Sequence, residues 1–365
     1  MIEREWNNRS WPLRQLRMNI DKLDTHRDYH CMLCYSIQST CKIIDNGGVQ
    51  MCYNLKKKKS NKAFGTNEEK KNFQELKMGE RAFEACKSYG QMMLECHNIL
   101  FPQSRFRVPI DLLLYPHMVL IGFRRKQIDP PAWKCGGSLI SAYWVLTAAH
   151  CIEDREYGKA SIMRIGMATF EFDEVDDLIQ ERPVSEIVPH PEYKPPSKYH
   201  DIALLKAKQP FLLSRDIRIA CLHLGEDISH LNMTAIGFGK TSSSASTGSE
   251  TLMMVNLDPI GSEHCNKSMK FLIKRKKLAN GITDSQLCAG DYLRGGRDTC
   301  QGDSGSSLLV MDENVDCIRR FPLYTIVGVT SFGRDCGRKM APGVYTRVSK
   351  YIDWIEDIVW PYQTQ

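Results

Sequence analysis

Residues 135–151 read CGGSLISAYWVLTAAHC. Within this stretch two short apolar runs, at 138–140 and 144–147, are separated by small and polar residues, which is typical of two successive β-strands. The pattern continues from Tyr115 toward the C-terminal region, where short apolar runs alternate with clusters of Gly, Pro, Asn and Asp. Further runs of this kind are found at 202–205, 308–310, 324–330 and 343–348. Many short strands with frequent turn signals indicate an all-β sandwich or barrel.

The end of the chain follows a different period. Val348, Ile352, Ile355 and Val359 recur at intervals of three and four residues, with charged side chains between them. This spacing predicts one amphipathic helix, whose apolar face would dock on the β-domain.

The sequence pattern predicts the structure of the first part of the chain less clearly. The 365 residues are 42% hydrophobic and 25% charged, which excludes collagen-like, coiled-coil and wholly disordered proteins. Residues 1–107 carry 19 basic and 12 acidic residues, including the run Lys56–Lys59, whereas 108–365 carry 30 and 31. We therefore expect a low-order basic extension over 1–79, with one helix near 72–94, and no nucleic-acid-binding surface on the larger part.

The cysteine count indicates the compartment. Fourteen cysteines are many for a cytosolic chain, and an even number of this size favours a disulfide framework in an oxidising environment. We predict a secreted, extracellular protein, although the first twenty residues contain no apolar run of signal-peptide length. No apolar stretch approaches the roughly 18 residues that a membrane-spanning helix needs.

Three motifs carry the residue types that acyl transfer requires. A serine hydroxyl is a poor nucleophile at neutral pH, so it needs an adjacent base, a group that orients the base, and donors for the developing oxyanion. His150 follows the strand predicted at 144–147, Asp201 precedes the run at 202–205, and Ser304 stands in the turn Gly-Asp-Ser-Gly. Each residue alone has an ordinary structural interpretation, but together, in the order His, Asp, Ser, they predict nucleophilic catalysis.

On these motifs, and on CGGSLI before the histidine and GVYTRV after the serine, the chain resembles the chymotrypsin-like serine proteases. The resemblance implies two six-stranded antiparallel β-barrels with a C-terminal helix. It makes Ser304 the nucleophile, His150 the general base and Asp201 the carboxylate that orients the base. The backbone N–H groups of Gly302 and Ser304 would form the oxyanion hole.

The resemblance also implies a substrate preference. Asp298 lies six residues before Ser304, where the family places the floor of its primary pocket, and a carboxylate there favours Arg or Lys. Gly333 and Gly343 match the two wall positions that must lack side chains for a long basic residue to enter. The other residues expected to line the substrate site are Ser331, which would also hydrogen-bond the triad carboxylate, and Phe332.

The same resemblance implies which cysteines form disulfide bridges. The three bridges common in the family correspond to Cys135–Cys151, Cys265–Cys288 and Cys300–Cys336. Cys221 resembles the site that tethers the protease to its preceding segment, with Cys96 as the expected partner, and parity leaves Cys86 with Cys317. The pairing of Cys31, Cys34, Cys41 and Cys52 stays open.

The tether, Pro116-His117-Met118 and the ending Trp354–Trp360 resemble the arthropod clip-domain proteases of the Snake kind. Members of this branch are secreted zymogens of extracellular cascades in immunity, melanisation or patterning. The resemblance therefore implies a protein substrate, namely a downstream zymogen, together with an upstream activating protease and a serpin-type inhibitor. Neither a nucleic-acid nor a membrane partner is expected.

Two departures from that branch are visible. Residues 1–79 hold four cysteines and no adjacent pair, where a clip domain has six, so we expect the clip to be degenerate or absent. Residues 80–107 would form a pro-segment and 108–365 the protease domain. Activation in the family frees an Ile-Val-Gly-Gly-like terminus that pairs with the acidic residue matched by Asp303, but here cleavage after Arg107 would release Val108 without those glycines. The alternative is therefore a non-activatable, non-catalytic protease-like binding protein.

No metal or cofactor is expected. Some relatives bind calcium in the loop after Gly166, but Met167 stands where a carboxylate ligand is usual, and calcium needs hard oxygen ligands. Acidic residues do follow nearby, at Glu171, Asp173, Glu174, Asp176 and Asp177.

Overall fold

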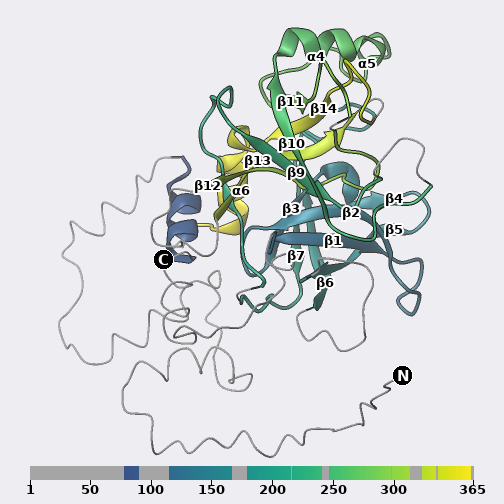
Figure 1. Ribbon diagram of the computed structural model, residues 1–365. Coiled ribbons are helices and arrows are strands. Elements are labelled where there is room, and N and C mark those ends of the chain that lie inside the picture. The colour runs from purple at the N-terminus through teal and green to yellow at the C-terminus, as the bar shows by residue number, and fades with distance from the viewer. Residues whose placement is uncertain are drawn as a thin grey trace, which may run out of the picture.

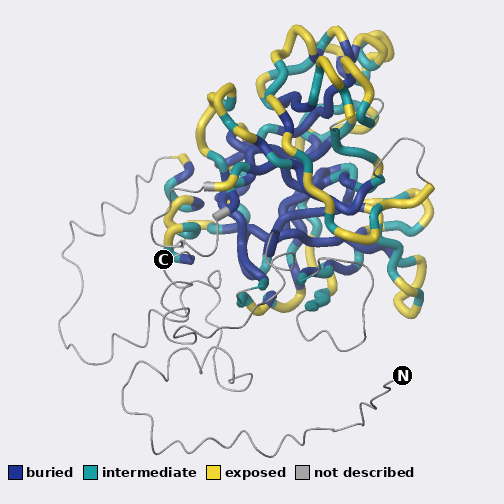
Figure 2. Tube along the Cα trace, in the orientation of Figure 1, coloured by how far each residue is buried: buried dark blue, intermediate teal, exposed yellow. Residues whose placement is uncertain are grey.

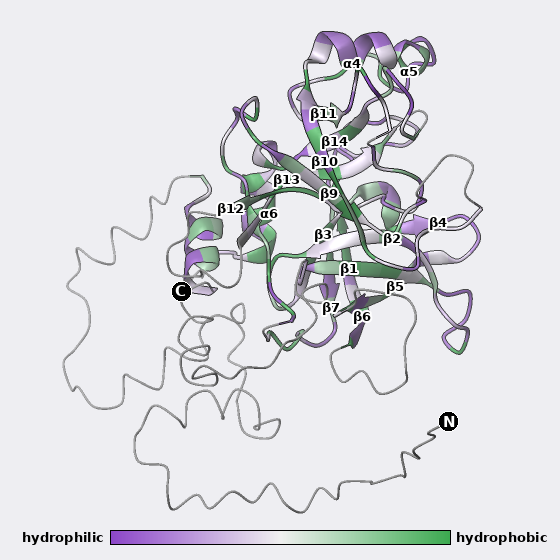
Figure 3. Cartoon of the chain, viewed as in Figure 1, coloured by the Kyte–Doolittle hydropathy of each residue, from purple (hydrophilic) through white to green (hydrophobic). Residues whose placement is uncertain are grey.

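Two antiparallel β-barrels lie side by side, as Figure 1 shows. The computed structural model describes residues 78–89, 115–166, 179–214, 216–240, 246–296, 298–312, 323–333 and 336–362. The all-β class with two six-stranded barrels, a C-terminal helix and few other helices is confirmed. Apolar side chains gather along the barrel strands and hydrophilic ones along α4 and α5 (Figure 3).

The first barrel closes through the pairing of β1 with β5, so that six strands form the barrel in the order β1-β2-β3-β7-β6-β5 and β4 extends the sheet. Its strands are β1 (Met118–Phe123), β2 (Ala132–Leu139), β3 (Trp144–Thr147), β4 (Glu153–Asp154), β5 (Gly158–Ile165), β6 (Gln180–Pro189) and β7 (Ala203–Ala207). The 3-10 helix η4 (Ala149–Cys151) follows β3 directly. The apolar run predicted at 144–147 is therefore a strand, and every residue of it is buried.

The second barrel closes in the same way, through β12 and β13, in the order β12-β9-β10-β11-β14-β13, and β8 adds to its edge. Its strands are β8 (Cys221–Leu222), β9 (Met233–Gly237), β10 (Met253–Ile260), β11 (Gln286–Gly290), β12 (Ser307–Asp312), β13 (Leu323–Phe332) and β14 (Gly343–Arg347). Two short helices, α4 (Ser262–Ser268) and α5 (Lys270–Lys274), lie in the connection between β10 and β11.

The C-terminal helix α6 (Ile352–Val359) follows the 3-10 helix η6 (Val348–Lys350). The four apolar residues that predicted this helix are all at most 6% exposed. They join the largest core cluster, which also contains side chains of β1, β3, β7, β12 and β13. The helix thus docks by its apolar face, as predicted, because docking on the barrels removes the apolar stripe of the helix from water.

Buried residues lie mainly along the strands of the two barrels (Figure 2), and they form three clusters. The largest cluster fills the first barrel and continues under α6, a second fills the second barrel, and a third lies beneath α4. Strand β1 is buried along its whole length, so its sequence reads as a continuous apolar run instead of an alternating one. None of the helices in the described part of the chain is long and apolar enough to span a membrane.

One helix of the N-terminal part is described, over residues 80–89, inside the range predicted for it. It begins against α6 and carries Cys86 to the edge of the second barrel, where Cys86 pairs with Cys221 of β8. The predictions of Cys96–Cys221 and Cys86–Cys317 are therefore wrong, because counting cysteines carries no information on where the helix docks. Cys96 and Cys317 lie outside the described residues.

The other bridges agree with the resemblance. The structure pairs Cys135 with Cys151, Cys265 with Cys288, and Cys300 with Cys336. Cys31, Cys34, Cys41 and Cys52 lie outside the described residues, as does the whole of 1–77.

Candidate active site

His150 and Asp201 meet because β3 and β7 pair. Thr147, the last residue of β3, is opposite Ala203, the first residue of β7, in antiparallel register. The residues just after β3 and just before β7 therefore lie at the same end of the sheet. The backbone N–H of His150 donates to Oδ1 of Asp201 at 2.9 Å, and Nδ1 of its ring lies 2.8 Å from Oδ2.

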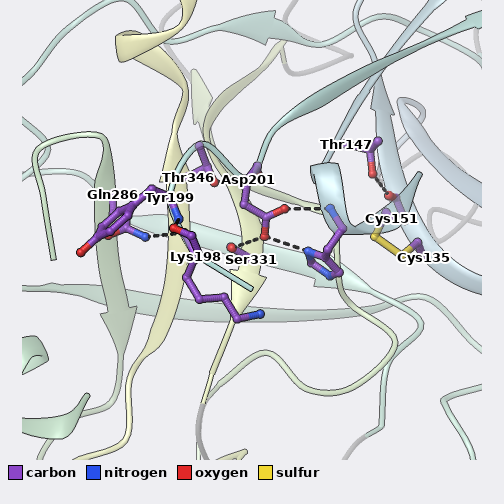
Figure 4. A network of polar contacts seen from close by, with 12 residues as sticks. Cys135, Thr147, Cys151, Lys198, Tyr199, Asp201, Gln286, Ser331 and Thr346 are labelled. Carbon is purple, nitrogen blue, oxygen red and sulfur yellow. Dashed lines mark hydrogen bonds and ion pairs between the residues drawn. A yellow bond between two sulfur atoms is a disulfide. The ribbon is translucent and has the colours of Figure 1, made fainter. Parts of the chain in front are cut away.

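Asp201 is 1% exposed and is surrounded by donors (Figure 4). The hydroxyl of Ser331, on β13, donates to Oδ2 of its carboxylate, and the hydroxyl of Thr346, on β14, donates to its carbonyl oxygen at 2.8 Å. Burial alone would raise the pKa of Asp201, but the charge and hydrogen bonds of His150 and the bond from Ser331 hold that pKa below its ordinary value. Asp201 therefore stays ionised and can orient the imidazole, with residues of both barrels in contact with it.

Ser304 stands in a turn that only glycines allow. Gly302 has φ +106° and Gly305 has φ +81°, and a Cβ on Gly305 would collide with Thr147 Oγ1 and the carbonyl of Gly136. The carbonyl of Ser304 accepts the N–H of Gly136 at 2.8 Å. The turn before β12 is thereby fixed against β2 of the first barrel.

A disulfide connects the same part of β2 to the histidine motif. Cys135, next to Gly136, is bridged to Cys151, which follows His150. A ring nitrogen of His150 and the two sulfur atoms lie within 4.8 Å of one another, and since both sulfurs are in the disulfide, this group offers no metal site. The three motifs His150, Asp201 and Ser304 are thus gathered at the seam between the barrels.

The turn itself uses several of its own N–H groups. Asp303 N–H donates to the carbonyl of Cys300 at 3.0 Å, Gly305 N–H to that of Thr330 at 2.9 Å, and Ser306 N–H to that of Asp303 at 3.0 Å. These donors flank the two N–H groups, of Gly302 and Ser304, that the resemblance assigns to the oxyanion hole. The turn is therefore rigid where that role would need fixed donors.

A second carboxylate, Asp298, lies at the end of a slot between glycines. A Cβ on Gly333 would meet only the Cα of Gly343, at 3.9 Å, whereas a Cβ on Gly343 would lie 3.0 Å from Asp298 Oδ1 and 2.9 Å from the Tyr345 hydroxyl. The two glycines therefore face each other, and Asp298 is reached past Gly343. Phe332, which is half-buried, precedes Gly333 on β13.

Asp298 has no charged partner among the contacts that the described residues show. It accepts the N–H of Thr299 at 2.8 Å and that of Gly337 at 3.4 Å. Burial raises the pKa of Asp298 to about 7, against the lowering effect of these two bonds. A cationic side chain entering the slot would supply the missing positive charge.

Sequence reasoning missed Tyr345 as a member of this pocket. Its buried hydroxyl lies 3.0 Å from Thr299 Oγ1, and burial next to Asp298 raises its pKa well above the ordinary value. The signal was present in the strand at 343–348, because residues two apart on a strand share a face and Gly343 was already placed in the pocket.

Asp303 is a third buried carboxylate. It accepts the N–H of Gly239 at 2.7 Å and that of Cys300 at 2.8 Å, and burial raises its pKa to about 6. Val108, whose new N-terminus would supply its cation, and Arg107, after which cleavage is expected, lie outside the described part of the chain. Residues 167–178, which include Met167 and the acidic residues near the calcium position of some relatives, also lie outside the described part.

Comparisons with known proteins agree with this geometry. The sequence model of the trypsin family matches residues 109–355. The chain is 37% identical over 248 residues to the serine protease snk of Drosophila melanogaster, covering 67% of this chain and 54% of that protein. It is 37% identical over 255 residues to the serine protease Hayan of the same fly, covering 69% and 38%. To the venom serine protease Bi-VSP of Bombus ignitus it is 36% identical over 253 residues, covering 67% and 65%. The chain thus spans about half of the length of the first of these relatives and less of the second.

Proposed function

Because this chain belongs to the trypsin family of serine proteases, we propose that it is a serine endopeptidase that cuts protein chains after Arg or Lys. The observation that carries the proposal is a combination of two features: the His150–Asp201 contact at 2.8 Å, and the Asp298 carboxylate beside Gly333 and Gly343, which has no charged partner among the described residues. The first supports the reaction and the second supports the substrate.

In the proposed reaction, Ser304 Oγ attacks the carbonyl carbon of the scissile bond. The Nδ1–H of His150 donates a hydrogen bond to the Asp201 carboxylate and keeps its proton, so the lone pair on Nε2 is free to accept the serine proton. The negative charge that develops on the carbonyl oxygen is stabilised by the N–H groups of Gly302 and Ser304. The imidazolium then gives its proton to the leaving amine, and water hydrolyses the acyl-enzyme by the reverse sequence.

The substrate preference follows from the charge of Asp298. Its pKa of about 7 means that the carboxyl in the empty slot is only partly ionised at neutral pH. A guanidinium or ammonium group bound beside it favours the ionised form, so ion pairing and proton loss are coupled. A neutral side chain would leave the buried carboxyl with its two backbone hydrogen bonds but without an opposite charge.

We propose further that the protein is a secreted zymogen. The four disulfides among the described residues suit an oxidising compartment. In this proposal a protease specific for Arg cleaves after Arg107, and the ammonium of Val108 pairs with Asp303, a carboxyl whose pKa is raised by burial. The segment 80–107 then stays attached through Cys86–Cys221 to the protease domain at 108–365.

The biological role that we propose rests on the resemblance to arthropod clip-domain proteases of the Snake kind. A downstream zymogen would be the substrate in an extracellular cascade of immunity, melanisation or patterning, with a serpin-type inhibitor acting on the enzyme. The second candidate, a non-catalytic protease-like binding protein, is favoured by the sequence at 104–111, which lacks the glycines that let a new terminus turn inward.

The test uses the full chain secreted behind a foreign signal sequence. It is treated with a trypsin-like activator, freed of the activator, and assayed on matched Arg, Lys and Leu amides beside a Ser304→Ala chain treated identically. The proposal predicts hydrolysis of the Arg and Lys amides only, by the wild type only, and no activation of an Arg107→Gln chain. A chain that is folded and shown by mass spectrometry to be cut after Arg107, yet hydrolyses none of them, would favour the binding protein.

A further inference from the structure

Two histidines and a glutamate converge beside the triad without a role in the proposed reaction. His190 and Glu192 follow β6, and His200 immediately precedes Asp201. Because β6 and β7 pair, with Pro189 opposite Ala203, the connection between them folds back on itself. The N–H of His190 donates to the carbonyl of Ile202 at 3.0 Å, which holds the two ends of the connection together.

The ligand atoms of these three side chains lie close to one another. The rings of His190 and His200 are stacked, with centroids 5.1 Å apart and an interplanar angle of 12°. Oε2 of Glu192 lies 3.8 Å from Nδ1 of His200. One ligand atom from each residue lies within 4.8 Å of the other two.

The surroundings hold the two rings and leave one side open. The Tyr351 hydroxyl lies 3.1 Å from Nδ1 of His200, while the rings of Tyr351 and Trp354 meet that of His190 edge-on at 5.0 and 5.1 Å. Glu192, by contrast, has 68% of its side chain exposed.

We propose that His190, Glu192 and His200 form a binding site for a divalent transition-metal ion of the zinc class. Two imidazoles and one carboxylate are a ligand set that zinc accepts, with the fourth position left to solvent on the open side. Calcium and magnesium prefer oxygen ligands and are not expected here. Zinc ligands lie about 2 Å from the ion, so ligand atoms that lie up to 4.8 Å apart must approach one another, and the exposed Glu192 side chain is able to rotate toward the two rings.

The position of the site connects it to catalysis. His200 has φ +55°, a left-handed conformation that is strained for a residue with a side chain, and its carbonyl accepts the N–H of Ile202 at 2.8 Å. Its backbone is therefore constrained, so a change in its side chain is passed to Asp201, the next residue. The ion also adds positive charge near the carboxylate that stabilises the imidazolium of His150. Bound metal should then slow hydrolysis, a consequence that rests on the proposed function.

The site is tested first without any assay of activity. The full, unactivated chain is titrated with Zn²⁺ by calorimetry and with Co²⁺ by visible absorption, beside the variants His190→Gln and Glu192→Gln. The matched control is His230→Gln, since His230 is exposed and has a single acidic neighbour, Asp227, at 3.7 Å. Cobalt also reports thiolate ligands, which separates this site from any cysteine site elsewhere in the chain. Thermal unfolding in the presence of a chelator checks that each variant is folded.

The proposal predicts one bound ion fewer per chain, or binding weakened by at least about tenfold, in the two site variants and no change in the control. Equal stoichiometry and affinity in the wild type and in folded His190→Gln would overturn it. In activated enzyme, inhibition of Arg-amide hydrolysis should have its midpoint at the measured Zn²⁺ affinity and move with it in His190→Gln. Full activity at saturating Zn²⁺ would overturn the connection to catalysis. An enzyme that cannot be activated would fail only this last assay, so the two failures are distinguishable.

Discussion

Replacing Glu356 by Gln should undock the helix at residues 80–89 from α6. The Glu356 side chain is 1% exposed, and its carboxylate accepts the N–H of Ala82 at 2.7 Å and that of Gly79 at 3.2 Å. It also lies 3.4 Å from Nε of Arg81. The first N–H groups of a helix have no partner inside the helix, and a negative charge there is favourable. Glu356 therefore caps this helix from another element of the fold.

The size of the effect can be worked out from these contacts. Glutamine keeps one acceptor oxygen but presents an NH₂ group where the second oxygen was, facing donors. Removing one partner of a buried ion pair costs about 3–5 kcal/mol. Arg81 keeps Asp357 at 2.8 Å and the carbonyl of Trp360 at 3.2 Å, so the lower end, about 3 kcal/mol, is expected. For a domain of about 250 residues this corresponds to a fall in Tm of about 6–12 °C.

The assay is thermal unfolding together with hydrogen exchange of the amides of residues 79–89. Cys86–Cys221 keeps the helix attached, so undocking should appear as faster exchange there even where the barrels stay folded. Asp357→Asn is the matched control, because Asp357 contacts the same Arg81 but is 67% exposed, and an exposed pair contributes about 0–1 kcal/mol. If Glu356→Gln left both Tm and exchange like those of Asp357→Asn, the capping role would be refuted.

Three further predictions concern the site. Ser331→Ala removes a hydroxyl that donates to the Asp201 carboxylate. The kcat on Arg amides should therefore fall about tenfold or more, while the affinity for benzamidine stays unchanged. An equal loss of kcat and of benzamidine affinity would contradict this prediction. Because the pKa of Asp298 is about 7, its carboxyl loses charge as pH falls through 7, and benzamidinium should bind at least about tenfold more weakly at pH 5 than at pH 8; a flat inhibition constant would argue against the pocket. Gly343→Ala places a methyl group 3.0 Å from Asp298 Oδ1 and should reduce kcat/KM for Arg substrates more than for Lys substrates, because the guanidinium is larger; an unchanged ratio would contradict the slot.

The parts that could be predicted from sequence are those in which a motif lies at the end of a strand. His150 and Asp201 flank β3 and β7, and pairing of these strands brings the two residues together. The C-terminal helix was equally predictable, because its apolar spacing is local. The helix prediction depends on residues a few positions apart, and the site prediction depends on short local motifs whose order along the chain matches a known family.

The parts that could not be predicted depend on contacts between distant segments. Cys86 reaches Cys221 because Glu356, more than 270 positions further along the chain than Gly79, caps the helix that carries it. The number of cysteines in the chain carries no information about that contact. His190 and His200 likewise meet only because the connection between β6 and β7 folds back, which the nine intervening residues do not reveal.

The most direct measurement is active-site titration with a guanidinobenzoate ester, whose guanidinium enters an Asp-based pocket and whose acyl group is transferred to the serine. With the chain cut after Arg107 and the activator removed, a burst of released phenol close to one equivalent per cut chain is expected, together with a mass increase confined to the peptide that contains Ser304. Neither should occur with Ser304→Ala, and the burst should be lost with Asp298→Asn. A folded, fully cut chain that gives no burst and no adduct on Ser304 would contradict the proposal that this protein is an Arg- or Lys-specific serine endopeptidase.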